Sequence, residues 1–288
     1  MEWYPLILEH KALIDQALEE NPLNLSDYTF TNLWIWNIHR HYQIAWIDNF
    51  LCIKFAEKGL TIFLYPIGSG SRQYVSEKLM EVEANFRMRA VPEEGIAELN
   101  ELPLKVEAET EHFDYIYAFT DLLYLQGDHF QPKRNFIHQF EKKYLFEYQE
   151  IALDLIPLII DFEKKWYSEH KNPPQSLCME HSGVLHALND FTKLNIFGGV
   201  LIVDKKVVAY SFAEYLNKQM LVIHIEKALK DYKGAYAMIH QQLLMHSTIV
   251  PFVNREEDLN LDNLIKVKQS YHPIRFEKKF LLTKNSEP

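Results

Sequence analysis

Two titratable side chains stand close together on one predicted strand. Residues 220–226 alternate in character, which predicts that Val222, His224 and Glu226 share one face of that strand. A carboxylate or an imidazole within hydrogen-bond reach can take the proton that an amine loses when it attacks an acyl carbonyl. We therefore expect Glu226 to act as the general base, with His224 beside it. The alternative is a pair of polar side chains that face solvent at a strand end.

A glycine turn follows this strand and leads into a predicted helix. The turn contains Tyr232, Lys233, Gly234, Ala235 and Tyr236. The free N–H groups of a helix N-terminus bind anionic oxygens, and a glycine lets a ligand approach the backbone closely. We expect the first four of these residues to bind the phosphates of a donor molecule, and Tyr236 or Tyr232 to give a proton to the leaving group. The alternative is a plain helix entry that contains a glycine.

A third group follows the next predicted strand, at Asn254, Arg255, Glu256 and Glu257. An arginine holds a phosphate or a carboxylate through two parallel hydrogen bonds. The two glutamates are suited to bind the amino group of a donor or of a cationic acceptor. We therefore expect this group to bind substrate. Acidic residues are also common just before a helix, whose N-terminus is positive, so helix capping is the alternative.

Positive charge is concentrated in two stretches of a chain whose net charge is −10. Residues 266–284 contain six Lys or Arg and a single Glu, and a smaller cluster comprises Lys133, Arg134, Lys142 and Lys143. Either cluster could bind tRNA phosphates or an anionic headgroup. Ordinary solvated faces are the alternative.

The predicted elements that carry these residues occur twice in the same order. Each half contains three antiparallel strands, a glycine turn, a helix, a strand, a helix and a last strand. The strands are predicted at 43–47, 50–56, 60–66, 88–91 and 113–118, and again at 199–204, 207–216, 220–226, 249–254 and 276–282. An offset of 163 residues places Val91 opposite Asn254 and Gly70 opposite Lys233.

This order predicts a tandem repeat of one α/β domain, and the alternative is a single α+β domain whose second half only looks similar. Each copy is expected to hold a mixed, mostly antiparallel sheet flanked by helices. We predict domain 1 at residues 1–130, a linking helix at residues 131–150 and domain 2 at residues 151–288.

The composition excludes several classes of protein. A hydrophobic share of 48% is that of a globular protein and excludes a disordered chain. Neither G-x-x-x-x-G-K-[ST] nor G-x-G-x-x-G occurs, so P-loop and Rossmann nucleotide sites are not predicted. The negative net charge disfavours a general DNA-binding protein. The chain also lacks C-x-x-C and H-E-x-x-H, and we predict no metal site.

The N-terminal residues lack the basic start and long apolar core of a signal peptide. The most apolar run, residues 153–162, contains two Asp and one Pro and is too short to span a bilayer. We therefore expect a cytoplasmic protein without a transmembrane segment.

The order of the repeated elements resembles the GNAT acyltransferase fold. Asn-Arg-Glu-Glu-Asp-Leu at 254–259, with residues 264–273, resembles the C-terminal domain of bacterial phosphatidylglycerol lysyltransferases. Residues 113–117, 133–135 and 197–201 fit the same family, and the resemblance covers most of the chain.

The resemblance implies two GNAT-like domains in tandem and an acyl or aminoacyl transferase. It implies that the donor is acyl-CoA or aminoacyl-tRNA, with no separate cofactor, and that the acceptor is an amine or hydroxyl of a small molecule or peptide. Tyr271, Lys133 and Arg134 join the implied substrate-binding residues. The turn departs from the family's coenzyme A pattern of Gln/Arg-x-x-Gly-x-Gly/Ala, because Asp231 and Tyr236 occupy its first and last positions. This departure favours the alternative, a degenerate GNAT pair that senses a small molecule or peptide.

Overall fold

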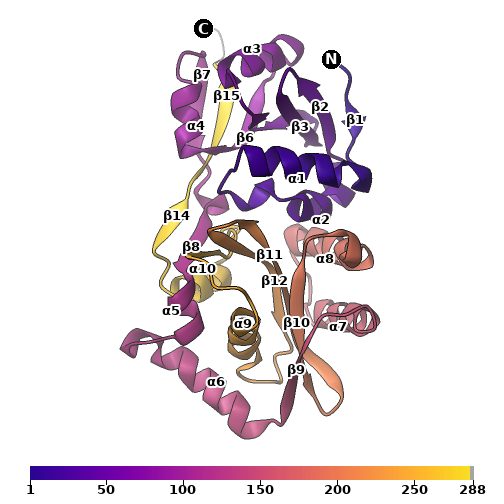
Figure 1. Ribbon diagram of the computed structural model, residues 1–288, viewed down its shortest axis with the longest axis vertical. Coiled ribbons are helices and arrows are strands. Elements are labelled where there is room, and N and C mark those ends of the chain that lie inside the picture. Colours follow the sequence, from indigo (N-terminus) through magenta and orange to yellow (C-terminus); the bar gives the residue numbers. More distant parts are fainter. Residues whose placement is uncertain (286–288) are drawn as a thin grey trace. The chain divides into compact units, whose positions relative to one another are not determined.

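The computed structural model describes residues 1–285 and divides into two compact units (Figure 1). Unit 1 comprises Met1–Asp114, Glu257–Leu261 and the chain from Phe276 onward. Unit 2 comprises Tyr115–Glu256 and Asp262–Arg275. We predicted boundaries at residues 130 and 150, whereas unit 1 ends at Asp114 before it resumes late in the chain, and the predicted linking segment at 131–150 lies within unit 2.

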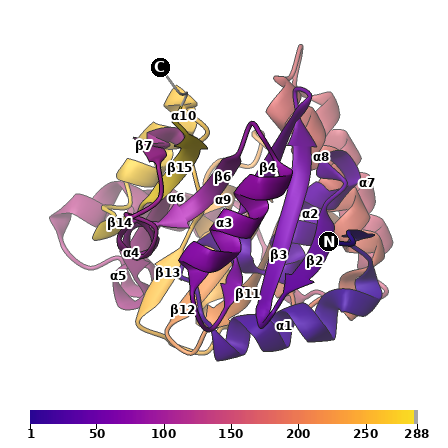
Figure 2. The ribbon, with the colours of Figure 1, turned by 90° about the horizontal axis from the view of Figure 1, so that it is seen from above.

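Unit 1 is built on one mixed sheet with the strand order β1-β2-β3-β4-β6-β15-β7, and β5 pairs with β3 (Figure 2). Its strands are β1 (Tyr4–Pro5), β2 (Gln43–Ile47), β3 (Phe50–Glu57), β4 (Leu60–Leu64), β5 (Ile67–Gly68), β6 (Arg87–Pro92), β7 (Leu104–Ala108) and β15 (Lys279–Lys284). Its helices are α1 (Lys11–Glu20), α2 (Phe30–Arg40), α3 (Arg72–Val82) and α4 (Glu93–Glu98). The side chains of Thr29 and Ser71 accept backbone N–H groups at the starts of α2 and α3, which satisfies donors that a helix end leaves free.

The sheet of unit 2 has the strand order β14-β8-β13-β12-β11-β10-β9. Its strands are β8 (Asp114–Ala118), β9 (Phe146–Glu150), β10 (Phe197–Val203), β11 (Lys206–Asn217), β12 (Met220–Ala228), β13 (Phe252–Asn254) and β14 (Arg275–Glu277). Its helices are α5 (Phe119–Tyr124), α6 (Gln131–Lys143), α7 (Ile156–Ser168), α8 (Gln175–Asn189), α9 (Ala235–Met245) and α10 (Asp262–Gln269). Figure 1 shows α9 on one face of this sheet and α7 with α8 on the other.

The two sheets share one topology, which confirms the predicted tandem repeat. In unit 1, β4 runs parallel to β6, and β15 lies antiparallel on the other side of β6. In unit 2, β12 runs parallel to β13, and β8 lies antiparallel on the other side of β13. The fold class is therefore the predicted one, two mixed and mostly antiparallel sheets flanked by helices.

The last strand of each sheet comes from the other half of the chain. The starts of β8 and β15 are 165 residues apart, close to the offset of the repeat, and the two strands hold equivalent places in their sheets, so they are equivalent copies. We expected the strand at 113–118 to complete the first domain and the strand at 276–282 to complete the second. That expectation is wrong, because β8 pairs with β13 of unit 2 and β15 pairs with β6 and β7 of unit 1.

Among residues 1–285, no helix combines the length and the apolar character that crossing a bilayer requires.

Candidate active site in unit 2

The strand β12 is irregular at the point where the predicted pair lies. Phe212 of β11 pairs with Ile225, and the next residue, Ala213, pairs with Ile223, so that His224 has no partner in the register. Such a bulge reverses the alternation of side chains on either side of it. Glu226 consequently faces α9, whereas His224 turns toward other carboxylates. The prediction that both share one face is therefore wrong.

His224 is held between two carboxylates. Its Nε2 lies 2.9 Å from Glu214 Oε1 and its Nδ1 lies 2.7 Å from Glu256 Oε1. Burial alone would lower the pKa of His224, but the two carboxylates outweigh it and raise that pKa to about 10. At neutral pH both ring nitrogens carry protons and both are engaged, so this residue has no lone pair with which to act as a base.

Glu226 forms a pair with a histidine that the sequence had not singled out. Glu226 Oε2 lies 2.8 Å from Nδ1 of His240, a fully buried residue of α9. Burial would raise the pKa of Glu226, but Arg255 and His240 lower it to about 2. Burial lowers the pKa of His240 although Glu226 opposes this effect. An ionised carboxylate beside a neutral imidazole places the shared proton on Nδ1, which leaves a lone pair on Nε2.

The Nε2 atom of His240 is buried and has no hydrogen-bond partner among the residues that the structure describes. A carboxylate that orients a neutral imidazole is the arrangement of a general base. The low pKa of Glu226 makes that carboxylate a weak base itself, so the geometry assigns it the orienting role. The local signal for His240 was one imidazole within the otherwise mostly apolar first turns of the helix 235–245.

Arg255 brings a cation to the same carboxylate. Its Nη2 lies 3.2 Å from Glu226 Oε1, and its guanidinium lies over the ring of Tyr271, 4.7 Å from the centroid. Its Nη1 is buried and has no partner within residues 1–285. The backbone that carries Arg255 is fixed by Lys268, whose ammonium donates to the carbonyl oxygens of Arg255 and Glu256. Asn254 accepts the N–H of Glu256 through Oδ1 at 2.7 Å.

Lys133 of α6 completes the group. Its Nζ donates to Ser270 Oγ at 2.5 Å and lies 3.9 Å from the centroid of the Tyr271 ring. Burial and the nearby Arg255 lower the pKa of Lys133 to about 8. The structure thus brings together four residues that the sequence predicted, Glu226, Arg255, Tyr271 and Lys133, and adds His240.

The glycine turn before α9 has a packing role. Gly234 has a φ of +94°, and a Cβ there would lie 2.2 Å from the carbonyl oxygen of Phe136 in α6. The close approach of α6 therefore accounts for the glycine without a phosphate. Tyr232 packs on Tyr144, with ring centroids 5.1 Å apart, and Tyr236 accepts a hydrogen bond from Trp166 Nε1 at 3.1 Å. The other two turn residues are Lys233, which is exposed, and Ala235, which is buried in the core.

The other predicted binding residues make separate contacts. Glu257 belongs to unit 1, where it bonds His112 Nδ1 at 2.9 Å. Arg134 donates to the carbonyl oxygens of Leu125 and Gly127 and thereby holds the loop before its own helix. The predicted basic cluster at 266–284 does not form one surface, because Lys268 is buried against backbone carbonyls and Lys279 is buried in unit 1. That prediction is wrong for these two lysines.

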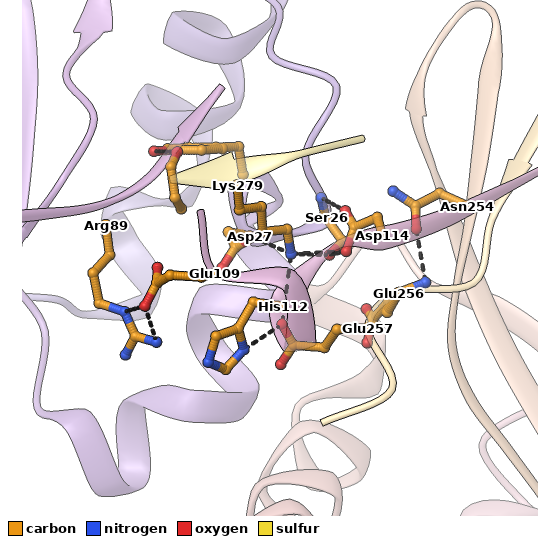
Figure 3. A network of polar contacts seen from close by, with 12 residues as sticks. Ser26, Asp27, Arg89, Glu109, His112, Asp114, Asn254, Glu256, Glu257 and Lys279 are labelled. Atoms are coloured by element: carbon orange, nitrogen blue, oxygen red, sulfur yellow. Dashed lines mark hydrogen bonds and ion pairs between the residues drawn. The ribbon is translucent and has the colours of Figure 1, made fainter. Parts of the chain in front are cut away.

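Lys279 of β15 is the centre of a network in unit 1 (Figure 3). Its Nζ lies 2.6 Å from Asp27 Oδ2, 2.7 Å from Asp114 Oδ1 and 3.7 Å from Glu257 Oε2. Asp114 also accepts the backbone N–H and the hydroxyl of Ser26, at 2.7 and 2.9 Å. Lys279 thus neutralises three carboxylates, and Asp114 is bonded by Ser26 as well, which is the character of a structural ion-pair network.

Within residues 1–285, no three His, Cys, Asp or Glu side chains gather as a metal site requires.

Comparisons with known proteins agree with this fold. The family described as phosphatidylglycerol lysyltransferase, C-terminal, matches residues 21–283. A crystal structure of a conserved protein of unknown function from Bacteroides thetaiotaomicron is 30% identical, with a TM-score of 0.93, and the match covers 99% of this chain and 100% of that one. No curated protein matches.

Two more distant structures share the fold. One is the C-terminal domain of a protein described as a lysylphosphatidylglycerol synthetase from Agrobacterium fabrum, at 12% identity and a TM-score of 0.68, covering 97% of this chain and 91% of that one. The other is L-PGS from Bacillus licheniformis, at 13% identity and a TM-score of 0.68, covering 96% and 92%. Since the family match spans most of the chain and the two sheets repeat one topology, the chain belongs to the phosphatidylglycerol lysyltransferase C-terminal family and has its tandem GNAT-like transferase fold.

Proposed function

We propose that the chain transfers an aminoacyl group from an activated ester, such as an aminoacyl-tRNA, to an amine or hydroxyl acceptor. The observation that carries this proposal is the Glu226–His240 pair, whose imidazole keeps a free Nε2, beside an Arg255 that keeps a free Nη1. A base and a hydrogen-bond donor are the two groups that acyl transfer requires.

The residues divide the reaction between them. His240 Nε2 takes the proton of the acceptor as its nitrogen or oxygen forms a bond to the acyl carbon. Glu226 stabilises the imidazolium that results, because its carboxylate accepts the Nδ1–H at 2.8 Å. Arg255 Nη1 and the Lys133 ammonium donate to the carbonyl oxygen as negative charge develops on it. The ester C–O bond then breaks, and His240 returns the proton to the leaving hydroxyl.

Three observations favour an ester donor over acyl-CoA. The packing of α6 against Gly234 explains that glycine without a pyrophosphate. Asp231 and Tyr236 depart from the coenzyme A pattern. The family is that of a lysyltransferase, and the structures with the same fold include one described as a lysylphosphatidylglycerol synthetase and one described as L-PGS. These names also make phosphatidylglycerol the first acceptor to test, before amines of small molecules and peptides.

The experiment follows label from a pool of radioactive aminoacyl-tRNAs into phosphatidylglycerol vesicles or into small amines. We expect transfer by the wild type, a fall of about a hundredfold or more in kcat for His240→Gln, and a smaller fall for Lys133→Met. His138→Gln, which removes an exposed histidine of α6, is the matched control and should keep full activity.

Three outcomes would overturn the proposal. These are no transfer of label from any aminoacyl-tRNA by the wild type, a wild-type kcat in His240→Gln, and faster transfer from acetyl-CoA than from any aminoacyl-tRNA. The pH profile gives an independent check. Activity should fall on the acid side as His240 is protonated and on the alkaline side as Lys133, whose pKa is about 8, loses its proton.

A second candidate is a binding protein that holds a carboxylate or phosphate at Arg255 without turnover. The departures at Asp231 and Tyr236 favour it, because a lost donor site is expected in a sensor. A thermal shift separates the two candidates. Stabilisation by a small anion that Arg255→Lys abolishes, with no transfer from any donor, would establish the sensor.

A further inference from the structure

A cavity in unit 2 lies apart from the Glu226 group and shares no residue with it. It measures about 340 Å³ and is lined by residues of β9, β10 and β11 and of the segment that follows α9. The lining residues used below are Tyr148, Glu150, Phe197, Tyr215, His246 and Thr248. Its volume falls in the range of sites that hold a small molecule.

The aromatic rings of this cavity are fixed in position. Tyr148 stacks on His246 with centroids 4.2 Å apart, and Phe197 stacks on Tyr215 with centroids 5.3 Å apart. The Tyr215 hydroxyl accepts the N–H of Thr248 at 2.7 Å and lies 3.2 Å from its carbonyl oxygen. The Tyr148 ring lies directly against Gly199, where a Cβ would come within 2.1 Å of it. A site whose rings are already ordered loses little side-chain entropy when a ligand binds.

The charge of the cavity is negative. Glu150 is its carboxylate, and no lysine or arginine occurs among the lining residues described. Tyr148 and Glu150 are two residues apart on β9 and therefore lie on the same face of the strand. Burial and the Glu150 carboxylate both raise the pKa of Tyr148, which shows that the negative field extends to the ring.

We propose that this cavity binds an organic cation, a primary or quaternary alkylammonium group held by the aromatic rings and neutralised by Glu150. Ring faces attract cations, and a carboxylate in the same cavity adds an electrostatic attraction that a cation experiences and a neutral or anionic ligand does not. The inference stands apart from the proposed aminoacyl transfer, because it uses none of the residues of that site.

The test is calorimetric titration of the full chain with choline and with butylammonium, and with 3,3-dimethylbutan-1-ol as the neutral analogue of choline. We expect saturable binding of the two ammonium ions and about tenfold weaker binding of the alcohol. Glu150→Gln should lower the affinity for the two ammonium ions about tenfold. The affinity for the alcohol should not change. Glu147→Gln is the matched control, because Glu147 is exposed on the opposite face of β9 and outside the cavity lining.

Four results would overturn the inference. These are no saturable binding of either ammonium ion, equal affinity for choline and its neutral analogue, an unchanged affinity in Glu150→Gln, and tighter binding of adenosine than of either ammonium ion. The last result would assign the stacked rings to a planar base instead. Choline titrations monitored by NMR methyl signals of the lining residue Ile196 would place the ligand in this cavity and not elsewhere.

Discussion

Lys279→Met is expected to destabilise unit 1 strongly. The ammonium lies 2.6 Å from Asp27 and 2.7 Å from Asp114, and the side chain of Asp114 is wholly buried. Methionine fills nearly the same volume but leaves these carboxylates without their cation. Removal of one partner from a buried ion pair costs about 3–5 kcal/mol, because the remaining charge is buried and uncompensated.

The pKa of Glu257 gives a second measure of the same field. Burial would raise it, but Lys279 and then His112 outweigh burial and lower it from 4.5 to about 2. A shift of that size corresponds to about 3 kcal/mol in favour of the ionised form. Lys279, His112 and Arg40 share this energy, so the loss of Lys279 alone removes only part of the stabilisation of the Glu257 carboxylate.

The adjacent lysine provides the control. Lys278 pairs with Glu93 at 2.8 Å, but both side chains are about half exposed, at 45% and 62%. An exposed pair of this kind contributes about 0–1 kcal/mol, so Lys278→Met should be nearly neutral. Urea unfolding followed by tryptophan fluorescence suits the comparison, since unit 1 holds four of the five tryptophans, Trp3, Trp34, Trp36 and Trp46.

The effect should also depend on pH in one direction. A carboxyl group whose pKa is lowered by folding stabilises the protein above its unfolded value, and this contribution is lost as the pH falls through the folded value. For Glu257 the window runs from about 4.5 down to about 2. The difference between wild type and Lys279→Met should therefore shrink below about pH 4. A loss below about 1 kcal/mol at neutral pH, or equal losses for the two lysines, would refute the reasoning.

Two further predictions concern unit 2. Gly234→Ala should lower the free energy of unfolding by roughly 2 kcal/mol or more, because its φ is +94° and its Cβ would meet a carbonyl oxygen at 2.2 Å. Gly59→Ala is the control and should cost about 1 kcal/mol, because φ there is +76° but the space is open. Equal losses in thermal unfolding would contradict the packing argument. The ion pairs of His224 raise its pKa from 6.5 to about 10, so their contribution is complete below about pH 6.5 and is lost as the pH rises toward 10. The urea midpoint of His224→Gln should accordingly depend less on pH across this window than that of the wild type, and identical slopes would show that the histidine is neutral.

Local turn chemistry explains why so much of the fold could be predicted from the sequence. Asp48, Lys58 and Gly59 adopt positive φ between β2, β3 and β4, and Asp and Gly are among the residue types that favour such turns. The three strands between them were predicted to within two residues of their ends. The repeat could be predicted as well, because the same strands and helices are predicted in the same order in both halves, at a nearly constant offset.

The features that could not be predicted depend on contacts between segments that are far apart in the sequence. The exchange of β8 and β15 between the two sheets depends on which strand edge each segment meets, and both copies carry similar local patterns. The bulge at His224 could not be predicted from the alternation of residues either. We assumed an uninterrupted strand, whereas one extra residue moves every later side chain to the opposite face of the sheet. Glu226 was therefore identified correctly as part of a polar group but was assigned the wrong neighbour, and His240 was missed.

Two buried carboxylates of unit 2 show what separates a structural network from a candidate site. Glu163 is fully buried and bonds His181, Tyr210 and Lys227 at 2.7 to 2.9 Å. Glu226 also has its oxygens occupied, but each of its partners, His240 and Arg255, keeps one buried nitrogen that has no hydrogen-bond partner within residues 1–285. An unsatisfied buried donor or acceptor costs about 1–3 kcal/mol.

Within residues 1–285, no buried side-chain atom of Glu163 or of its three partners lacks a hydrogen-bond partner, so burial of a carboxylate in unit 2 does not by itself impose this cost. Arg255 and His240 therefore lower the stability of the free chain, because each keeps a nitrogen that only a further molecule can satisfy. A ligand with one acceptor for Arg255 Nη1 and one proton for His240 Nε2 would recover that energy on binding, and an acyl carbonyl with an attacking amine or hydroxyl provides both. Arg255→Lys keeps a cation beside Glu226 but removes the second guanidinium nitrogen. If this variant keeps the thermal stability of the free chain while it abolishes transfer, the unsatisfied nitrogen belongs to the substrate. If it lowers stability as much as Lys227→Met does, Arg255 is structural and the site lies elsewhere.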